Sequence, residues 1–134
     1  MARVTDEHQQ RRLNLLARFD ALKIDALLIT NRANVRYLTG FTGSNGWLLL
    51  ADSKGLLITD PRYTVQARQE TSCRVRIVKG TKMQQALLDA IGRGKRRRIG
   101  LDTGQVSHKA HEALRQELPL GVELIDAAGA VESQ

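Results

Sequence analysis

Apolar positions along the chain follow two different periods. A stripe at helical spacing predicts an opening helix over 7–22, with Thr5 and Asp6 as candidate caps. Three further helices are predicted, one from Pro61 to about residue 70, one over 83–91 and one from Ser107 to Leu118, ending before Pro119.

Shorter apolar runs between these stripes predict strands. The run 26–29 is continuous and suits a strand buried on both faces at the centre of a sheet. Runs 47–50 and 56–59 flank an Asp-Ser-Lys-Gly turn and predict an antiparallel hairpin. Alternating arginines in 73–77 indicate an edge strand, and two more strands are predicted at 99–101 and 122–125.

Six strands interspersed with four helices predict an α/β fold, a three-layer α/β/α domain with a mixed sheet of about six strands. A chain of 134 residues is long enough for one such core. We assign residues 1–126 to this domain. The small and polar tail 127–134 reads as the beginning of a linker.

The formal net charge of +7 raises the question of a nucleic-acid partner. Much of the excess lies in the run 93–98, which separates a predicted helix from a predicted strand and reads as a solvated loop. Basic and aromatic residues do not interleave, as a single-strand binding surface requires. We therefore expect no nucleic-acid partner.

Cysteine content and the N-terminus bear on location. Cys73 is the single cysteine and reads as a packing residue, so a reducing compartment, the cytoplasm, is expected. The first ten residues are polar, without the apolar run of a signal peptide or membrane helix. We expect no membrane partner.

Three catalytic motifs can be imagined and each lacks its context. His108 and His111 share a predicted helix face, but no convincing third metal ligand accompanies them. The triplet at Asp102 resembles half of a dimeric aspartic protease site, yet a helix follows it at once. Ser44 has no nearby histidine or nucleophile elbow.

Glycines at 40, 43 and 46 do not match the dinucleotide-binding spacing, and a strand follows them where that motif needs a helix. They more simply permit tight turns before Trp47. Segments 34–46 and 59–63 combine glycines with aromatic and arginine side chains at two turns beside apolar strands. Such groups at turns more often serve a site than a core.

In chain order, the opening helix, ALLIT at 26–30, YLTGFTGS at 37–44, TDPRY at 59–63, QA at 66–67 and IGLD at 99–102 form one combination. This combination resembles the N-terminal domain of aminopeptidase P and prolidase, which creatinase shares. The resemblance covers nearly the whole chain and implies the same fold.

In that family a C-terminal pita-bread domain follows, where two Asp, one His and two Glu bind two divalent metal ions such as Mn, Co or Zn. A metal-bound hydroxide there attacks the peptide bond before proline. The resemblance implies that this chain is the non-catalytic N-terminal part of such a hydrolase. It would hold no catalytic residue, metal ligand or cofactor of its own.

Family N-terminal domains help to form oligomers and border the substrate mouth. By that analogy Tyr37, Phe41, Arg62 and Tyr63 are the candidates for the mouth or the interface. Arg62 has donors for a peptide carboxylate or carbonyl, and the rings suit a proline-sized apolar surface. The competing interpretation is that Tyr37 and Phe41 pack the loop and that Arg62 pairs with Asp60.

The partners that the resemblance implies are the chain's own C-terminal catalytic domain, further copies of itself and a proline-containing peptide. Two other interpretations stay open, a stand-alone interaction or regulatory module and the N-terminal domain of a prolidase-like or creatinase-like amidohydrolase. Pro61 departs from the family, since many relatives have glycine or another residue there.

Overall fold

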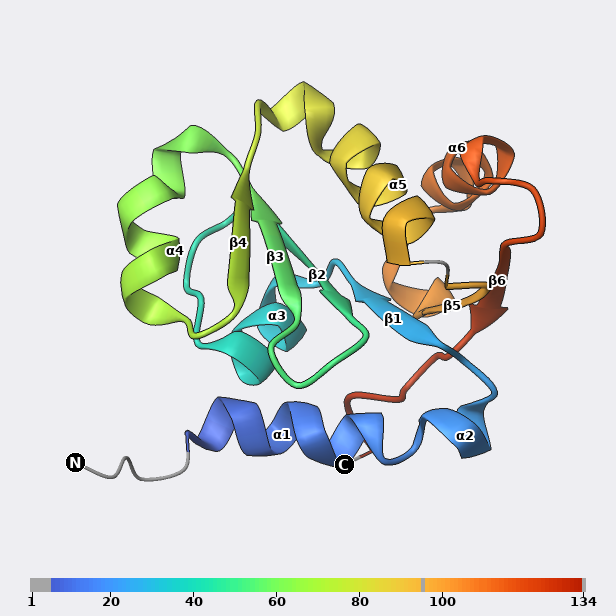
Figure 1. Cartoon of the computed structure of the whole chain (residues 1–134), viewed down its shortest axis with the longest axis horizontal. Helices are drawn as coiled ribbons and strands as arrows, with labels where there is room; N and C mark the ends of the chain where they lie inside the picture. Colours follow the sequence, from blue (N-terminus) through green and yellow to red (C-terminus); the bar gives the residue numbers. More distant parts are fainter. Residues whose placement is uncertain (1–5, 95, 134) are drawn as a thin grey trace.

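A mixed six-stranded sheet forms the middle layer of the protein (Figure 1). The structure is a computed structural model that describes residues 6–94 and 96–133. Its strands lie in the order β4-β3-β2-β1-β5-β6. Their bounds are β1 Ala26–Ile29, β2 Gly46–Leu50, β3 Leu56–Thr59, β4 Arg74–Ile77, β5 Arg98–Leu101 and β6 Glu123–Asp126.

The strand pairings fix which ends meet. β1 and β5, β5 and β6, and β3 and β4 pair in parallel, whereas β2 is antiparallel to both β1 and β3. All strands except β2 therefore run in one direction. Their carboxyl ends and the start of β2 share one side of the sheet, which we call the carboxyl edge.

Helices cover both faces of the sheet (Figure 1). One core cluster lies between the sheet and the first four helices, and the other lies under α5 and α6. The predicted three-layer α/β/α architecture is confirmed. The helix bounds are α1 Glu7–Leu16, α2 Phe19–Leu22, α3 Arg32–Thr39, α4 Thr64–Glu70, α5 Met83–Gly94 and α6 His108–Glu117, with short 3-10 turns at Pro61–Tyr63, Gly80–Lys82 and Thr103–Gln105.

The central strand β1 shows why an unbroken apolar run was required. Leu27 and Ile29 belong to the cluster under the first helices, and Ala26 and Leu28 belong to the cluster under α5 and α6. Successive strand side chains point to opposite faces, so a strand covered on both sides needs an apolar residue at every position. The predictions of a central β1, a β2–β3 hairpin and an edge strand β4 are confirmed.

Two helix predictions need correction. The opening helix is broken into two, because α1 ends at Leu16 and α2 begins only at Phe19. Lys23 then closes the short α2 in a left-handed conformation (φ 61°). Asp6 caps α1 by accepting a hydrogen bond from the His8 amide at 2.9 Å, while Thr5 lies outside the described residues. The segment interpreted as a turn before Gly40 contains the helix α3.

Helix α3 has local signals at both ends. Asn31 accepts a hydrogen bond from the Asn34 amide at 3.0 Å, and Gly40 closes the helix at φ 85°, where a side chain would be strained. Eight residues offer only about two turns, which is too short for a clear periodic pattern. Tyr37 therefore sits on a helix and not on a turn.

Arg12 of α1 is buried, with 1% of its surface exposed. Its guanidinium donates to the Ser53 carbonyl and the Leu38 carbonyl, both at 2.8 Å, and to the Ser72 hydroxyl at 3.3 Å. These partners belong to the hairpin turn, the end of α3 and the segment before β4. One side chain thus joins α1 to three distant parts of the chain.

The segment after β6 packs onto the domain. Ala127, Ala130 and Val131 are buried in the cluster under the first helices, and Arg18 donates to the Ala130 carbonyl at 2.9 Å. That 127–134 begins a linker stays a prediction.

Two further observations concern single features. Cys73 is a free and buried cysteine, as the packing interpretation predicted, and burial raises the pKa of its thiol. Within the described ranges, no helix has the length and apolar character needed to cross a bilayer.

Candidate functional site

The loop of residues 40–45, at the carboxyl edge between α3 and β2, is built around Phe41. Phe41 is 1% exposed and meets Tyr63 edge to face, with ring centroids 5.4 Å apart. A Cβ at Gly43 would lie 2.3 Å from the Phe41 ring, and one at Gly46 would lie 2.8 Å from it. The loop can close over this ring only because both positions lack a side chain.

A carboxylate of α4 holds the same loop from the side. Glu70 accepts a hydrogen bond from the Thr42 amide at 2.9 Å and another from the Thr42 hydroxyl at 2.9 Å. Gln66 donates its amide to the Thr42 hydroxyl at 2.8 Å. Burial alone would raise the pKa of Glu70, but these hydrogen bonds outweigh it and lower that pKa.

Tyr63 fixes the loop tip. Its hydroxyl lies 2.7 Å from the Ser44 hydroxyl and accepts a hydrogen bond from the Ser44 amide at 3.2 Å. Hydrogen bonding from Ser44 lowers the pKa of the Tyr63 phenol. The Tyr63 side chain is therefore held at two points, by the perpendicular contact of its ring with Phe41 and by Ser44 at its hydroxyl.

Asp60, directly after β3, is the buried charge of the site. Only 6% of its side chain is exposed, and it accepts hydrogen bonds from Arg62 Nε at 2.9 Å and Arg62 Nη2 at 2.8 Å. Asn45 donates to it at 2.7 Å. These hydrogen bonds, first those from Arg62, hold the pKa of Asp60 far below its usual range.

Arg62 offers the exposed positive charge of the site. Its side chain is 66% exposed, and its guanidinium carbon lies 5.1 Å from the centre of the Tyr63 ring. Two of its nitrogens are fixed by Asp60, so the guanidinium plane is preorganised. Such a group can bind a carboxylate or a carbonyl oxygen without losing much rotamer freedom.

The structure brings three of the four predicted site residues together. Phe41, Arg62 and Tyr63 form one cluster, in which Phe41 is buried support and the other two reach the surface. Tyr37 lies on α3 against α1, with the Arg11 guanidinium 4.3 Å from its ring centre. The pairing of Arg62 with Asp60, the competing interpretation of that residue, is present.

Sequence reasoning missed three members of the cluster. Asn45, Glu70 and Gln66 were not singled out as site residues, although each bonds to the loop or to Asp60. The only sequence signal was the spacing of Gln66 and Glu70, which places both on one face of α4. Nothing in the sequence indicated that this face would meet Thr42.

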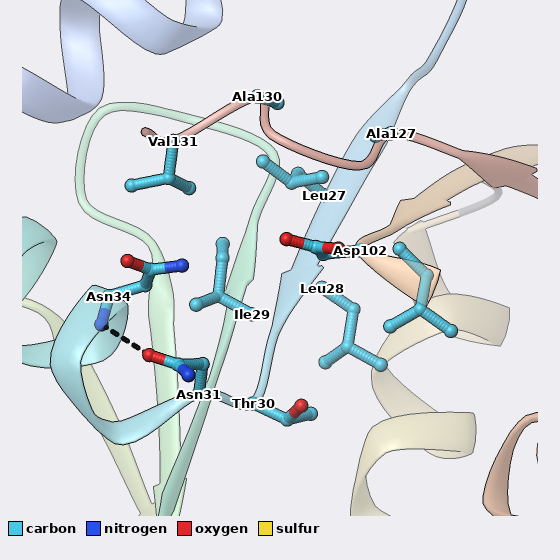
Figure 2. Close-up of a pocket in the computed structure, with 11 residues that line it drawn as sticks. Leu27, Leu28, Ile29, Thr30, Asn31, Asn34, Asp102, Ala127, Ala130 and Val131 are labelled. Atoms are coloured by element: carbon cyan, nitrogen blue, oxygen red, sulfur yellow. Dashed lines mark hydrogen bonds between the residues drawn. The ribbon is translucent and has the colours of Figure 1, made fainter. Parts of the chain in front are cut away.

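A second hollow at the carboxyl edge lies between the ends of β1 and β5 and the segment after β6 (Figure 2). Figure 2 shows Asn31 and Asn34 at one end of it and Asp102 at the other, with Ala127, Ala130 and Val131 closing it. Its free volume is about 10 Å³, roughly that of one water molecule. It has no room for a larger ligand.

Among the described residues there is no group of three or more His, Cys, Asp and Glu side chains arranged to hold a metal. Asp102 caps a 3-10 turn by accepting from the Gly104 amide at 3.0 Å, next to α6 and within an α/β fold. That context differs from the all-β aspartic proteases.

Comparison with known proteins gives a family match. A family model described as Creatinase/Prolidase N-terminal domain matches residues 11–134. An uncharacterized peptidase, YqhT, of Bacillus subtilis is 33% identical over 114 residues, which are 85% of this chain and 32% of the relative. The chain thus spans about a third of the length of this curated relative.

Two solved structures show the same fold at similar identity. One is the N-terminal domain of the cytoplasmic peptidase PepQ of Mycobacterium tuberculosis, with a TM-score of 0.82 at 35% identity over 92% of this chain and 97% of that one. The other is an Xaa-Pro aminopeptidase of Streptococcus thermophilus, with a TM-score of 0.78 at 31% identity over 93% of this chain and 96% of that one.

Proposed function

The chain belongs to the creatinase/prolidase N-terminal domain family, and we propose that it serves as the non-catalytic part of an aminopeptidase P-like Xaa-Pro peptidase. In this proposal the loop 40–45 and its supports border the substrate mouth and contribute to oligomer assembly. The peptide bond before proline would be cleaved elsewhere in the parent protein. The names of relatives support the substrate class.

The observation that carries the proposal is that Arg62 is both exposed and held in place. An exposed guanidinium is anchored by the buried Asp60 and stacked beside Tyr63 at the carboxyl edge, where ligands of α/β sheets are commonly bound. Two donor nitrogens of Arg62 bind Asp60, which fixes the guanidinium in position. Arg62 would bind a carboxylate or carbonyl of the peptide, with the Tyr63 ring as an apolar wall.

The described residues include no group of three or more His, Cys, Asp and Glu side chains that could bind the metal ions of the family. His108 and His111 lie on α6, and the nearest carboxylate there, Glu112, binds Arg115 at 2.9 Å. We therefore assign the two divalent ions and their chemistry to a different part of the parent protein. This chain's own contribution would be to position and to select the peptide.

A first experiment tests the division of labour. The purified chain with manganese or cobalt added should show no cleavage of an Xaa-Pro peptide, and the product of the complete reading frame should cleave it. Turnover that co-purifies with the 134-residue chain would contradict the proposal.

A second experiment tests Arg62 in the complete gene product. Arg62→Ala should raise KM for an Xaa-Pro peptide by about 10-fold with a smaller change in kcat, as the loss of one charged contact implies. Arg68→Ala is the matched control, because Arg68 lies exposed on the neighbouring helix α4. Equal KM values for the two variants would rule out a substrate contact.

The same preparations test assembly. Light scattering of the complete gene product and its Tyr37→Ala variant would show whether the exposed face of α3 takes part in an interface. We propose homo-oligomers, and we propose the cytoplasm as the compartment because Cys73 is kept as a free thiol.

A further inference from the structure

A crevice opens between α5 and α6 at the carboxyl edge, apart from Arg62 and Tyr63. Its volume is about 110 Å³. Figure 1 shows that both helices cover the same face of the sheet. The lining is mostly apolar, with Thr30 and Gln84 as its polar members; it comprises Leu28, Thr30, Trp47, Gln84, Leu87, Leu101, Val106, Ala110 and Leu114.

The position of the crevice follows from the topology. β1 and β5 are parallel neighbours, but β1 leads into α3 on one face and β5 leads towards α6 on the other. Connections that leave neighbouring strands on opposite faces open a gap outside their carboxyl ends, which is where open α/β sheets bind ligands. Leu28 and Leu101, which are paired across these two strands, both line it.

Size selects the apolar group. An apolar cavity of about 150 Å³ accommodates benzene, so this smaller crevice suits a branched aliphatic side chain better than an aromatic ring. α6 buries only Leu114, and Ala110 at the rim is exposed. The walls on that side are thus open to an entering side chain.

Charge selects the polar group. α5 and α6 both begin at the carboxyl edge, so the positive ends of their dipoles face it, and the exposed Lys82 and Lys109 lie at these ends. Of the carboxylates on this side, Glu112 is paired with Arg115, whereas Asp102 accepts from the Gly104 amide and keeps its charge. The two lysines and the two helix ends outweigh that single charge, so the rim favours an anion.

We propose that this crevice binds the carboxyl-terminal aliphatic residue of a peptide. The branched side chain occupies the cavity beside Trp47, the carboxylate lies at the lysine-bearing rim, and Gln84 and Thr30 serve the adjoining amide. The site does not depend on the role proposed for Arg62, because it shares none of its residues.

Trp47 is the only tryptophan of the chain and so reports on the crevice. Titration with N-acetyl-L-leucine should shift its fluorescence saturably and move the backbone amide resonances of Gln84 and Ala110. N-acetylglycine should bind about 10-fold or more weakly, since it lacks the buried carbons. N-acetyl-L-leucinamide should bind several-fold more weakly at low salt, with the difference lost in high salt.

A matched pair of variants separates the crevice from the helix surface. Ala110→Leu places a side chain at the rim and should abolish the titration, whereas Ala113→Leu, exposed on the same helix but outside the lining, should leave it intact. Circular dichroism confirms that both variants fold. Equal binding of all three probes, or an unchanged titration of the Ala110→Leu variant, would overturn the proposal.

Discussion

Loop 40–45 and the crevice between α5 and α6 share one edge of the sheet and are built in opposite ways. The loop is fixed by the buried Phe41 ring and by two carboxylates and a phenol hydroxyl, and these polar groups have hydrogen-bond partners at 2.7 to 3.2 Å. The crevice has apolar walls and an α6 that buries only Leu114. Beside the loop, Asp60 holds Arg62 in one orientation, while the crevice is bounded mainly by apolar side chains.

Removing the ring at the centre of the loop should have the largest effect. Phe41→Ala should lower the free energy of unfolding by about 3–5 kcal/mol, because the bonded loop cannot collapse into the space. Leu114→Ala, beside a hollow that already exists, should cost less, about 2–3 kcal/mol. Urea denaturation compares the two, and a larger loss for Leu114→Ala would break the contrast.

Two glycines sharpen the contrast in packing. Gly43→Ala forces a methyl group against the Phe41 ring and should cost about 1–3 kcal/mol. Gly92→Ala in α5 meets no atom within 4 Å and should stabilise the protein by about 0.5–1 kcal/mol. Thermal unfolding should therefore show a lower Tm for Gly43→Ala and a higher Tm for Gly92→Ala than for the wild type. A destabilised Gly92→Ala variant would show that the α5 side is as tightly packed as the loop.

The buried carboxylate of the loop gives a smaller, pH-dependent effect. Asp60→Asn should lower stability by about 2 kcal/mol at pH 7, because the charge-assisted bonds to Arg62 weaken. The folded pKa of Asp60 is depressed below the unfolded value of about 3.9. Its contribution is therefore complete above that value and is lost as the pH falls towards the folded pKa.

The stability difference between the wild type and Asp60→Asn should accordingly narrow between about pH 5 and pH 2. Urea midpoints at several pH values measure it. Asp89→Asn is the control on α5, where an exposed pair with Arg76 at 3.6 Å should contribute less than about 1 kcal/mol at any pH. A difference for Asp60→Asn that does not change with pH would contradict the assigned role of the charge.

What could be predicted from the sequence was local. The β2–β3 hairpin follows from two apolar runs and a turn between them, and Asp60 before Pro61 signals the start of a helix. The bonds from Thr42 to Glu70 join residues 28 apart, and no periodicity encodes such a meeting. The burial of Arg12 could not be predicted either, because an arginine in an amphipathic helix normally faces solvent.

Arg12 also sets an order of events during synthesis. Its Ser72 partner lies 60 residues further along the chain, and its carbonyl partners become available only after α3 and the hairpin turn have formed. During synthesis, α1 is made before all three of these partners. Before Ser72 is added, one of the hydrogen bonds of Arg12 has no acceptor, so α1 docks fully only when the segment before β4 is present.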